Sequence, residues 1–134
     1  MRLRDAEPRD RAAIRSLQSQ LSHPSPALSE AATDGPFTCR VAVESDRPVG
    51  YAVALSGRQT VLSELVVAAD HRREGYGRAL LAAVTRDADL VEATTPAGND
   101  AAIEFYGAQG FEVDGRLEAF YADDTDALRL VRGE

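Results

Sequence analysis

The spacing of hydrophobic positions divides the first third of the chain into short elements. Ile14, Leu17 and Leu21 recur at the spacing of one helix face, and Pro8 suits the first turn of that helix. Two prolines in Ser22–Pro26 then end the helix. The elements predicted here are a strand Met1–Arg4, a helix from Pro8, and a short helix Ala27–Ala32 closed by a turn at Asp34–Pro36.

Further along the chain, segments rich in Val, Phe and Tyr alternate with turn residues and with two more helical patterns. The predicted strands of the middle part are Phe37–Glu44, Val49–Leu55 and Thr60–Val67. The predicted elements that follow are the helix Gly75–Arg86, the strand Leu90–Thr95, the helix Asn99–Gln109 stopped by Gly110, and closing strands Phe111–Val113, Glu118–Tyr121 and Ala127–Val131.

This order of elements indicates a single α/β domain over residues 1–134. The length of 134 residues fits one domain, and the sequence contains no internal repeat or low-complexity tract. Strands interleaved with helices favour a mixed, twisted sheet, here of six to seven strands with about four helices.

Composition and charge exclude several classes of protein. The chain is 44% hydrophobic and 28% charged, which is typical of a folded domain. Its net charge of −7 argues against a nucleic-acid or anionic-membrane binder. The longest uncharged apolar run, Leu65–Ala69, is far too short to cross a membrane, and no signal peptide opens the chain. We therefore expect a cytoplasmic location.

Cysteine and histidine are scarce, which limits redox and metal chemistry. The single cysteine, Cys39, excludes an internal disulfide and is expected in the core of a strand. The two histidines, His23 and His71, lie far apart in the sequence, so we expect no dedicated metal site.

A loop after the strand Thr60–Val67 carries the clearest chemical motif. Gly75 and Gly77 open the next helix, where glycine lets a ligand approach the backbone and the first N–H groups point outward. Three arginines, Arg72, Arg73 and Arg78, add positive charge around this helix end. An ordinary tight turn is the alternative, but the strand, the arginines and the helix together favour a phosphate-binding site. The motif is neither a Walker loop nor a dinucleotide fingerprint.

Two motifs give the chain a resemblance to a known family. The pattern Arg72-x-x-Gly75-x-Gly77 after a valine-ending strand resembles the acyl-CoA loop of the GCN5-related N-acetyltransferases. The family's second signature is matched by Asn99–Phe111, which reads Asn-x-x-Ala-x-x-x-Tyr-x-x-x-Gly-Phe. The predicted order of elements matches this family over nearly the whole chain.

The resemblance implies a fold detail and a set of residues that bind acetyl-CoA. In the family, the strands that match Thr60–Val67 and Leu90–Thr95 splay apart, and the pantetheine arm lies in the gap. Backbone N–H groups at the helix start would hold the pyrophosphate. The implied cofactor-binding residues are Leu65, Val66, Val67, Arg72, Arg73, Glu74, Gly75, Tyr76, Gly77, Arg78, Asn99 and Tyr106.

The same resemblance assigns Tyr106 as the general acid, seven residues after Asn99. A phenol with a pKa near ~10 is protonated at neutral pH and can donate its proton to the departing thiolate. The alternative is that Tyr106 only packs its helix. A backbone N–H at Val67 would polarise the thioester carbonyl, as an oxyanion hole does.

The general base stays open between two carboxylates. Glu64 lies just before the cofactor-pairing segment, where many relatives place a glutamate that acts through water; its alternative is a solvent-facing edge carboxylate. Glu92 is the second candidate, because the position used by N-terminal acetyltransferases of the family is Thr94 here. An α-amino group with a pKa near ~8 needs less help from a base than lysine at ~10.4 does, which favours α-amines as acceptors.

The C-terminal part offers a clue to the acceptor. Its aromatic pair, polar turn and final strand resemble the tail of ribosomal-protein alanine N-acetyltransferases, in which the tyrosine matching Tyr121 lies beside the incoming peptide. A simple hairpin is the alternative for this segment. Three functions stay in play: an N-terminal protein acetyltransferase, an enzyme acting on a small amine, amino acid or antibiotic, and a non-catalytic acyl-CoA-binding module. The chain is expected to be a monomer or homodimer.

Overall fold

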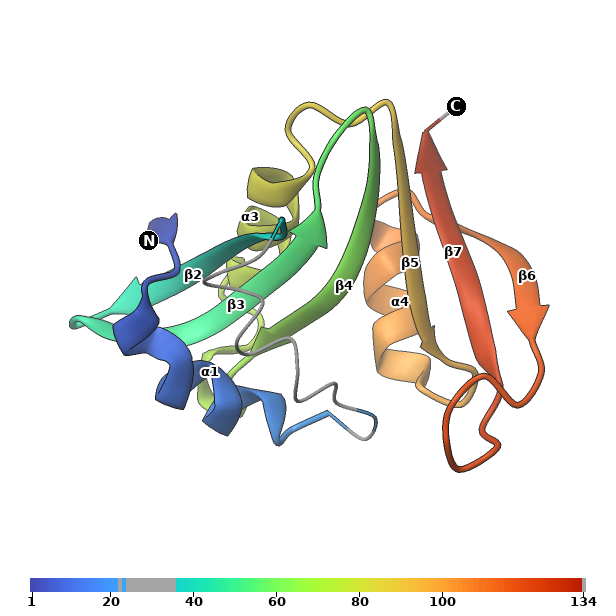
Figure 1. The fold of residues 1–134 in the computed structure, drawn as a ribbon, viewed down its shortest axis with the longest axis horizontal. Coiled ribbons are helices and arrows are strands. Elements are labelled where there is room, and N and C mark those ends of the chain that lie inside the picture. Colours follow the sequence, from blue (N-terminus) through green and yellow to red (C-terminus); the bar gives the residue numbers. More distant parts are fainter. Residues whose placement is uncertain (22, 24–35, 134) are drawn as a thin grey trace.

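The computed structural model describes residues 1–21, 23 and 36–133, and it contains one seven-stranded sheet (Figure 1). The strands are ordered β1-β2-β3-β4-β5-β7-β6; β4 and β5 run parallel, and every other neighbouring pair is antiparallel. Their bounds are β1 Arg2–Asp5, β2 Thr38–Glu44, β3 Arg47–Leu55, β4 Gln59–Val67, β5 Leu90–Pro96, β6 Glu112–Leu117 and β7 Ala127–Gly133. The predicted mixed α/β sheet is confirmed.

Helices cover both faces of the sheet. In Figure 1, α1 lies on one face, and α3 and α4 lie on the other. The helical segments are η1 Pro8–Asp10, α1 Arg11–Gln18, η2 Ala69–His71, α3 Tyr76–Val84 and α4 Asp100–Ala108. The predicted short helix Ala27–Ala32 and its closing turn lie outside the described residues, apart from Pro36. No helix in the described ranges is long and apolar enough to cross a membrane.

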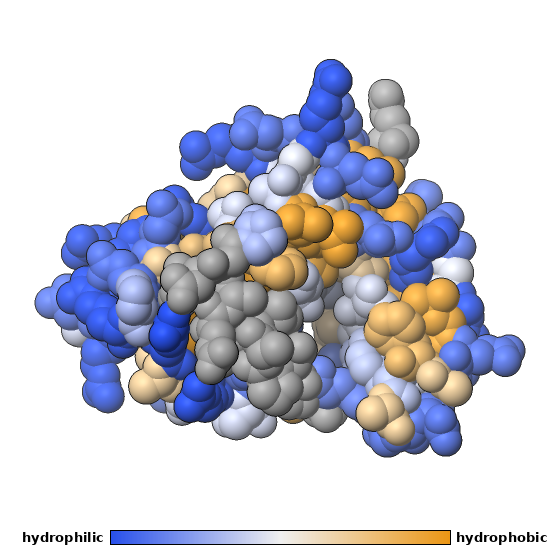
Figure 2. All heavy atoms as spheres, in the orientation of Figure 1, coloured by the Kyte–Doolittle hydropathy of each residue, from blue (hydrophilic) through white to orange (hydrophobic). Residues whose placement is uncertain are grey.

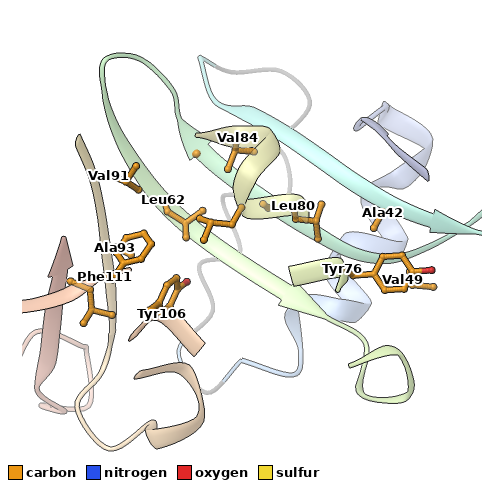
Figure 3. Close-up of a cluster of buried hydrophobic side chains, with 14 residues drawn as sticks. Ala42, Val49, Leu62, Tyr76, Leu80, Val84, Val91, Ala93, Tyr106 and Phe111 are labelled. Atoms are coloured by element: carbon orange, nitrogen blue, oxygen red, sulfur yellow. The ribbon is translucent and has the colours of Figure 1, made fainter. Parts of the chain in front are cut away.

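Two apolar clusters, one on each face, hold these layers together. On the α3 face, Leu80, Leu81 and Val84 pack against β3, β4 and β5, and the cluster extends to Tyr106 and Phe111 (Figure 3). On the α1 face, the helix contributes its two buried apolar residues, Ile14 and Leu17. The buried Cys39 belongs to this second cluster, as expected, and burial raises the pKa of its thiol to about 12.

The β2–β3 connection shows how local sequence sets strand register. Ser45 and Asp46 both have positive φ, 52° and 62°, so the two strands are joined by a two-residue hairpin of the primed type. Glu44 pairs with Arg47 directly across it. Strand β3 therefore begins two residues earlier than the predicted Val49.

One predicted strand is wrong. Glu118–Tyr121 is a turn rather than a strand, because Ala119 takes a φ of 48° and its N–H donates to the Asp126 carboxylate at 2.9 Å. The preceding strand β6 is longer than the predicted Phe111–Val113 and reaches Leu117. Its pairing with β7 shifts register at Asp114, an irregularity that a simple alternation of residue types does not reveal.

An extra residue in β4 reverses which face its side chains occupy. The pairing with β3 runs Ala54 to Leu62 and then Val53 to Glu64, so Ser63 is bulged. Leu62 consequently faces the α3 cluster, whereas Val66, four residues on, faces the α1 cluster. Glu64 shares the face of Val66, because regular alternation resumes after the bulge.

The parallel pair in the centre of the sheet opens along its length. Strands β4 and β5 pair only from Gln59–Leu90 to Leu62–Ala93. Beyond that point the two strands diverge, as Figure 1 shows, and the last residues of β4 have no partner in β5. The implied splay of the central strands is confirmed, and it leaves an opening between the two halves of the sheet.

Candidate active site

The loop that follows β4 ends at a helix start with a left-handed backbone. Arg73 has a φ of 64° and Gly75, the N-cap of α3, a φ of 88°. Ala79 is the first residue of α3 whose N–H reaches a helix carbonyl, that of Gly75 at 3.1 Å. The N–H groups before it therefore form the open donor end of a helix, which favours an anion.

The first two residues of α3, Tyr76 and Gly77, face the interior. Tyr76 is buried and donates its hydroxyl to the Glu44 carboxylate at 3.0 Å. At Gly77, an added Cβ would lie 3.3 Å from the Phe105 ring. The side chain of Tyr76 therefore packs in the core, so this residue can offer a ligand only its backbone. The absence of a side chain at Gly77 lets the helix start pack closely against the Phe105 ring.

The charged side chains of the loop divide into two groups. Arg73 and Arg78 are exposed beside the helix start. Arg72 instead turns toward the opening, where its Nε donates to the Val67 carbonyl at 3.3 Å and its Nη2 to the side chain of Gln20 at 3.1 Å. Arg72 would have to exchange these partners before it could reach a phosphate.

A cluster on the far side of the loop ties it to β2. Glu44, His71 and Glu74 each bring one potential metal-ligand atom within 4.8 Å of the others. Nδ1 of His71 lies 3.0 Å from the Glu44 carboxylate and 3.3 Å from that of Glu74. All three side chains are partly exposed, and these mutual contacts account for their arrangement. The expectation of no metal site stays a prediction.

The backbone of β4 directs pairing groups into the opening, and of these the Val67 carbonyl already accepts a hydrogen bond from Arg72. The N–H of Ala68 donates to the Val49 carbonyl at 2.8 Å, so the even-numbered residues of this stretch bond toward β3. The alternation directs the N–H and C=O groups of Leu65 and Val67 toward the gap left by β5. This arrangement fits an extended, amide-containing ligand that adds to the strand edge.

Tyr106 lies beside the opening, on the α3 face. It is buried among aromatic rings, with centroids 5.3 Å from Phe105 and 5.2 Å from Phe111. Figure 3 shows Tyr106 and Phe111 next to Ala93 of β5. Burial raises the pKa of Tyr106, and the proximity of Tyr121 raises it further. The phenol therefore stays protonated throughout the neutral range.

Asn99 has a structural task that the motif alone did not show. It is the N-cap of α4, and its side-chain oxygen accepts a hydrogen bond from the N–H of Ala102 at 3.2 Å. This cap fixes the start of the helix that carries Tyr106 seven residues later. The side-chain amide group of Asn99 is exposed at the same helix end.

Glu64 had two interpretations, a base that acts through water and a solvent-facing edge carboxylate. The structure excludes the second, because Glu64 is buried. Its exposed fraction is 8%, because the bulge at Ser63 turns it onto the α1 face. Nε2 of Gln18 donates to both carboxylate oxygens, at 3.0 and 3.2 Å, and the hydroxyl of Tyr51 donates at 2.8 Å. Burial and the nearby Glu64 carboxylate raise the pKa of Tyr51, so this phenol remains a donor.

Glu92 is less enclosed and is engaged with a different partner. Its carboxylate lies 3.5 Å from Nε of Arg129 on β7. The guanidinium of Arg129 is shared with Asp114 of β6, so the three residues form a small charged group. The carboxylate of Glu92 is therefore held in an ion pair with Arg129.

Tyr121 lies in the loop between β6 and β7 and is partly buried, which raises its pKa. Its ring stacks on that of His23, with centroids 4.2 Å apart and an angle of 27° between the planes. Nε2 of His23 lies 2.9 Å from the Asp123 carboxylate. Hydrogen bonds from Thr125 and from His23 lower the pKa of Asp123 to about 2.

The surface above these groups is hollowed. Figure 2 shows a depression on the α1 side, between the part of the surface over β4 and the part over the β6–β7 loop. The depression coincides with the place where β4 and β5 diverge. An anion-binding helix start, an open strand edge, a protonated phenol and a buried carboxylate therefore surround one opening, which is suited to acyl transfer from a phosphorylated carrier.

Sequence reasoning missed three residues of this region: Gln18, Tyr51 and His23. Gln18 is a buried polar residue at the end of α1, beside the buried Ile14 and Leu17, and Tyr51 is fully buried in β3. His23 contacts residues about a hundred positions away. A buried polar residue on an apolar face was the one available signal, because such a group requires a hydrogen-bond partner.

Comparison with known proteins adds to this geometry. Residues 5–111 match the sequence profile described as "Acetyltransferase (GNAT) family". N-alpha-acetyltransferase 30 of Xenopus laevis is 32% identical over 106 residues, which are 71% of this chain and 39% of that protein. The chain thus spans well under half the length of this relative.

Among solved structures, Ard1 from Thermoplasma volcanium is similar with a TM-score of 0.84 and 24% identity, covering 98% of this chain and 95% of the other. The ribosomal-protein-S18-alanine N-acetyltransferase from Escherichia coli gives a TM-score of 0.83 and 20% identity, covering 98% and 92%. At such identities the likeness establishes a common fold.

Proposed function

This chain belongs to the acetyltransferase (GNAT) family, and from that membership we propose that it transfers the acetyl group of acetyl-CoA directly to a primary amine. We propose further that this amine is the N-terminal α-amino group of a protein. The observation that carries the proposal is the opening between β4 and β5, with the anion-binding start of α3 and the buried Tyr106 beside it.

Acetyl-CoA, as co-substrate, supplies the activated thioester. Its diphosphate is held by the N–H groups at Gly75, Tyr76, Gly77 and Arg78, and the exposed arginines add charge. The backbone edge of Leu65–Val67 pairs with the amides of the pantetheine arm. The open N–H end of α3 and the edge of β4 beyond its pairing with β5 support this placement.

Three groups of the chain carry out the proton transfers and the charge stabilisation. Glu64 accepts the proton of the acceptor ammonium, directly or through water, and the neutral amine attacks the thioester carbonyl. The N–H of Val67 stabilises the oxyanion that forms. Tyr106 donates its proton to sulfur as the carbon–sulfur bond breaks. Glu64 is preferred to Glu92 because it directly precedes the open backbone edge Leu65–Val67, whereas Glu92 lies in an ion pair with Arg129.

Two considerations support an N-terminal α-amine as the acceptor. The relative from Xenopus laevis is described as an N-alpha-acetyltransferase. An α-amino group near pKa ~8 is also partly neutral at physiological pH, so one water-bridged carboxylate is sufficient. Tyr121, at the rim of the opening, is the proposed contact for the peptide. Because acetyl-CoA and newly made proteins meet in the cytoplasm, we propose that location.

A substrate panel tests the proposal by measuring the release of free CoA thiol. Short peptides that begin with Ala, Ser or Thr should be acetylated well, whereas polyamines and aminoglycosides should react weakly. Mass spectrometry should place the acetyl group on the α-amine. Faster reaction with a polyamine or aminoglycoside than with any peptide would overturn the acceptor assignment and favour a small-molecule enzyme. Absence of transfer to all amines, with acetyl-CoA still bound, would favour the non-catalytic module.

A further inference from the structure

Glu44 ends strand β2 and contacts the loop that leads into α3. Its backbone is held by the pairing of β2 with β3 at the hairpin. Its Oε2 atom accepts a hydrogen bond from the Tyr76 hydroxyl at 3.0 Å, and Nδ1 of His71 lies 3.0 Å from the same atom. One carboxylate oxygen on a fixed strand therefore contacts both ends of the stretch 71–76.

The stretch between these two contacts contains a backbone conformation that requires support. Arg73 has a φ of 64°, in the left-handed region that a residue with a side chain rarely adopts. Such a conformation persists only where the surrounding structure holds it. The N–H of His71 donates to the Ala68 carbonyl at 2.9 Å, which fixes the first part of the loop, and Tyr76 begins α3. The contacts of Glu44 therefore hold the chain on both sides of Arg73.

Further contacts orient the two side chains that meet Glu44. The ring of Tyr76 packs in the α3 cluster (Figure 3), and the ring of His71 meets it edge-on with centroids 6.1 Å apart. Nδ1 of His71 also lies 3.3 Å from the Glu74 carboxylate. Because Tyr76 is the first residue of α3, its hydrogen bond to Glu44 helps to fix the direction of the open N–H groups at this helix end.

We propose that Glu44 is a positioning residue for acetyl-CoA: by holding His71 and Tyr76, it keeps the N–H groups at the start of α3 aligned on the diphosphate. This inference rests on the proposed function and extends it to a residue of β2, outside the loop motif. The charge of Glu44 has the opposite consequence, because a carboxylate near an anion site repels the anion. Removal of Glu44 therefore strengthens binding if only its charge matters, and weakens binding if its contacts matter.

Glu44→Ala removes the shared oxygen and should raise the Kd and the KM for acetyl-CoA about fivefold. The aligned loop is then populated for a smaller fraction of the time, and the apparent affinity falls by that fraction. The kcat at saturating acetyl-CoA should change by less than about twofold, because the bound loop is aligned again. Calorimetric titration measures the Kd, and thiol release with an Ala-initiated peptide measures KM and kcat. Thermal unfolding verifies that each variant is folded.

Three further variants separate hydrogen bonding from charge. Tyr76→Phe keeps the ring in the core but removes one contact, and should raise the Kd about threefold. Glu44→Gln loses the charge but keeps an oxygen that accepts the Tyr76 hydrogen bond, and should bind acetyl-CoA at least as tightly as the parent. Asp46→Asn is the matched control, because it removes a carboxylate from the adjoining hairpin at a φ of 62°, which asparagine accepts readily. It should not weaken binding.

Unchanged or tighter binding in Glu44→Ala would overturn the inference about Glu44 alone. A loss in Glu44→Gln or Asp46→Asn as large as that in Glu44→Ala would do the same, and so would a fall in kcat that accompanies the rise in KM. The Kd measurements need no acceptor, so they are independent of which amine is acetylated. A parent protein that does not bind acetyl-CoA would overturn both this inference and the proposed function.

Discussion

Two regions flank the opening between β4 and β5: the loop 72–78 that leads into α3, and the acceptor face that carries Glu64, Tyr121 and His23. The loop consists of consecutive residues, and it offers mainly backbone N–H groups arranged by the φ of Arg73 and Gly75. The acceptor face is assembled from side chains of α1, β3, β4 and the β6–β7 loop.

From this difference we expect the two regions to tolerate sequence change differently. A backbone site requires glycine at defined positions and little else, so its motif stays recognisable over a short stretch. A side-chain site requires that several elements pack in one register, and equivalent positions can be filled by different residues. We therefore expect the sequence of the loop to indicate the co-substrate, and the side chains of the acceptor face to indicate the acceptor.

Tyr106 lies between the two regions, and its substitution should have the largest effect. Tyr106→Phe keeps the ring among Phe105 and Phe111 but removes the proton donor, so kcat should fall about 10³-fold. Because burial raises the pKa of Tyr106, the parent should show no loss of activity from its ionisation up to about pH 10. Steady-state thiol release across pH measures both effects.

Binding of acetyl-CoA to Tyr106→Phe, measured by calorimetry, should match the parent within about twofold, which separates chemistry from affinity. A variant with undiminished kcat would leave Tyr106 as a packing residue only. Glu64, the proposed base on the acceptor face, would then be the one side chain still proposed to transfer a proton.

Most of the fold and the whole loop follow from local sequence, whereas the acceptor face does not. Most strands and both helices after the loop have local causes, and the structure places them as predicted within a few residues. The strand predicted at Glu118–Tyr121 failed because Ala119 adopts a positive φ and bonds to Asp126.

The direction of Glu64 had no local cause at all. Alternation along β4 left its face undecided, and only the bulge at Ser63, created by pairing with β3, turned the carboxylate toward Gln18. A bulge is defined by how two strands pair, so the sequence of one strand alone does not predict it. The same holds for the contact of His23 with Tyr121.

Glu64→Gln tests whether the acceptor face contributes a base. The amide cannot take a proton from the acceptor, so kcat/KM for an Ala-initiated peptide should fall about 10²-fold at neutral pH. Glu92→Gln is the matched control, because the structure engages that carboxylate with Arg129; it should stay within about twofold of the parent. Rates measured with saturating acetyl-CoA compare the two variants. The reverse order of effects would transfer the base to Glu92.

The smallest effect concerns the loop, where Gly77→Ala should weaken acetyl-CoA binding about tenfold. The new Cβ would lie 3.3 Å from the Phe105 ring, so the ring and the first turn of α3 must move apart by a few tenths of an ångström. We expect this movement to disturb the alignment of the helix N–H groups on the diphosphate. Gly107→Ala in α4 is the control, because a Cβ there meets nothing within 4 Å. It should leave the Kd unchanged and stabilise the fold by about 0.5–1 kcal/mol. Calorimetric titration and thermal unfolding measure the pair. Equal affinities in the two variants would mean that the diphosphate lies elsewhere, and the contrast between a backbone site and a side-chain site would no longer hold.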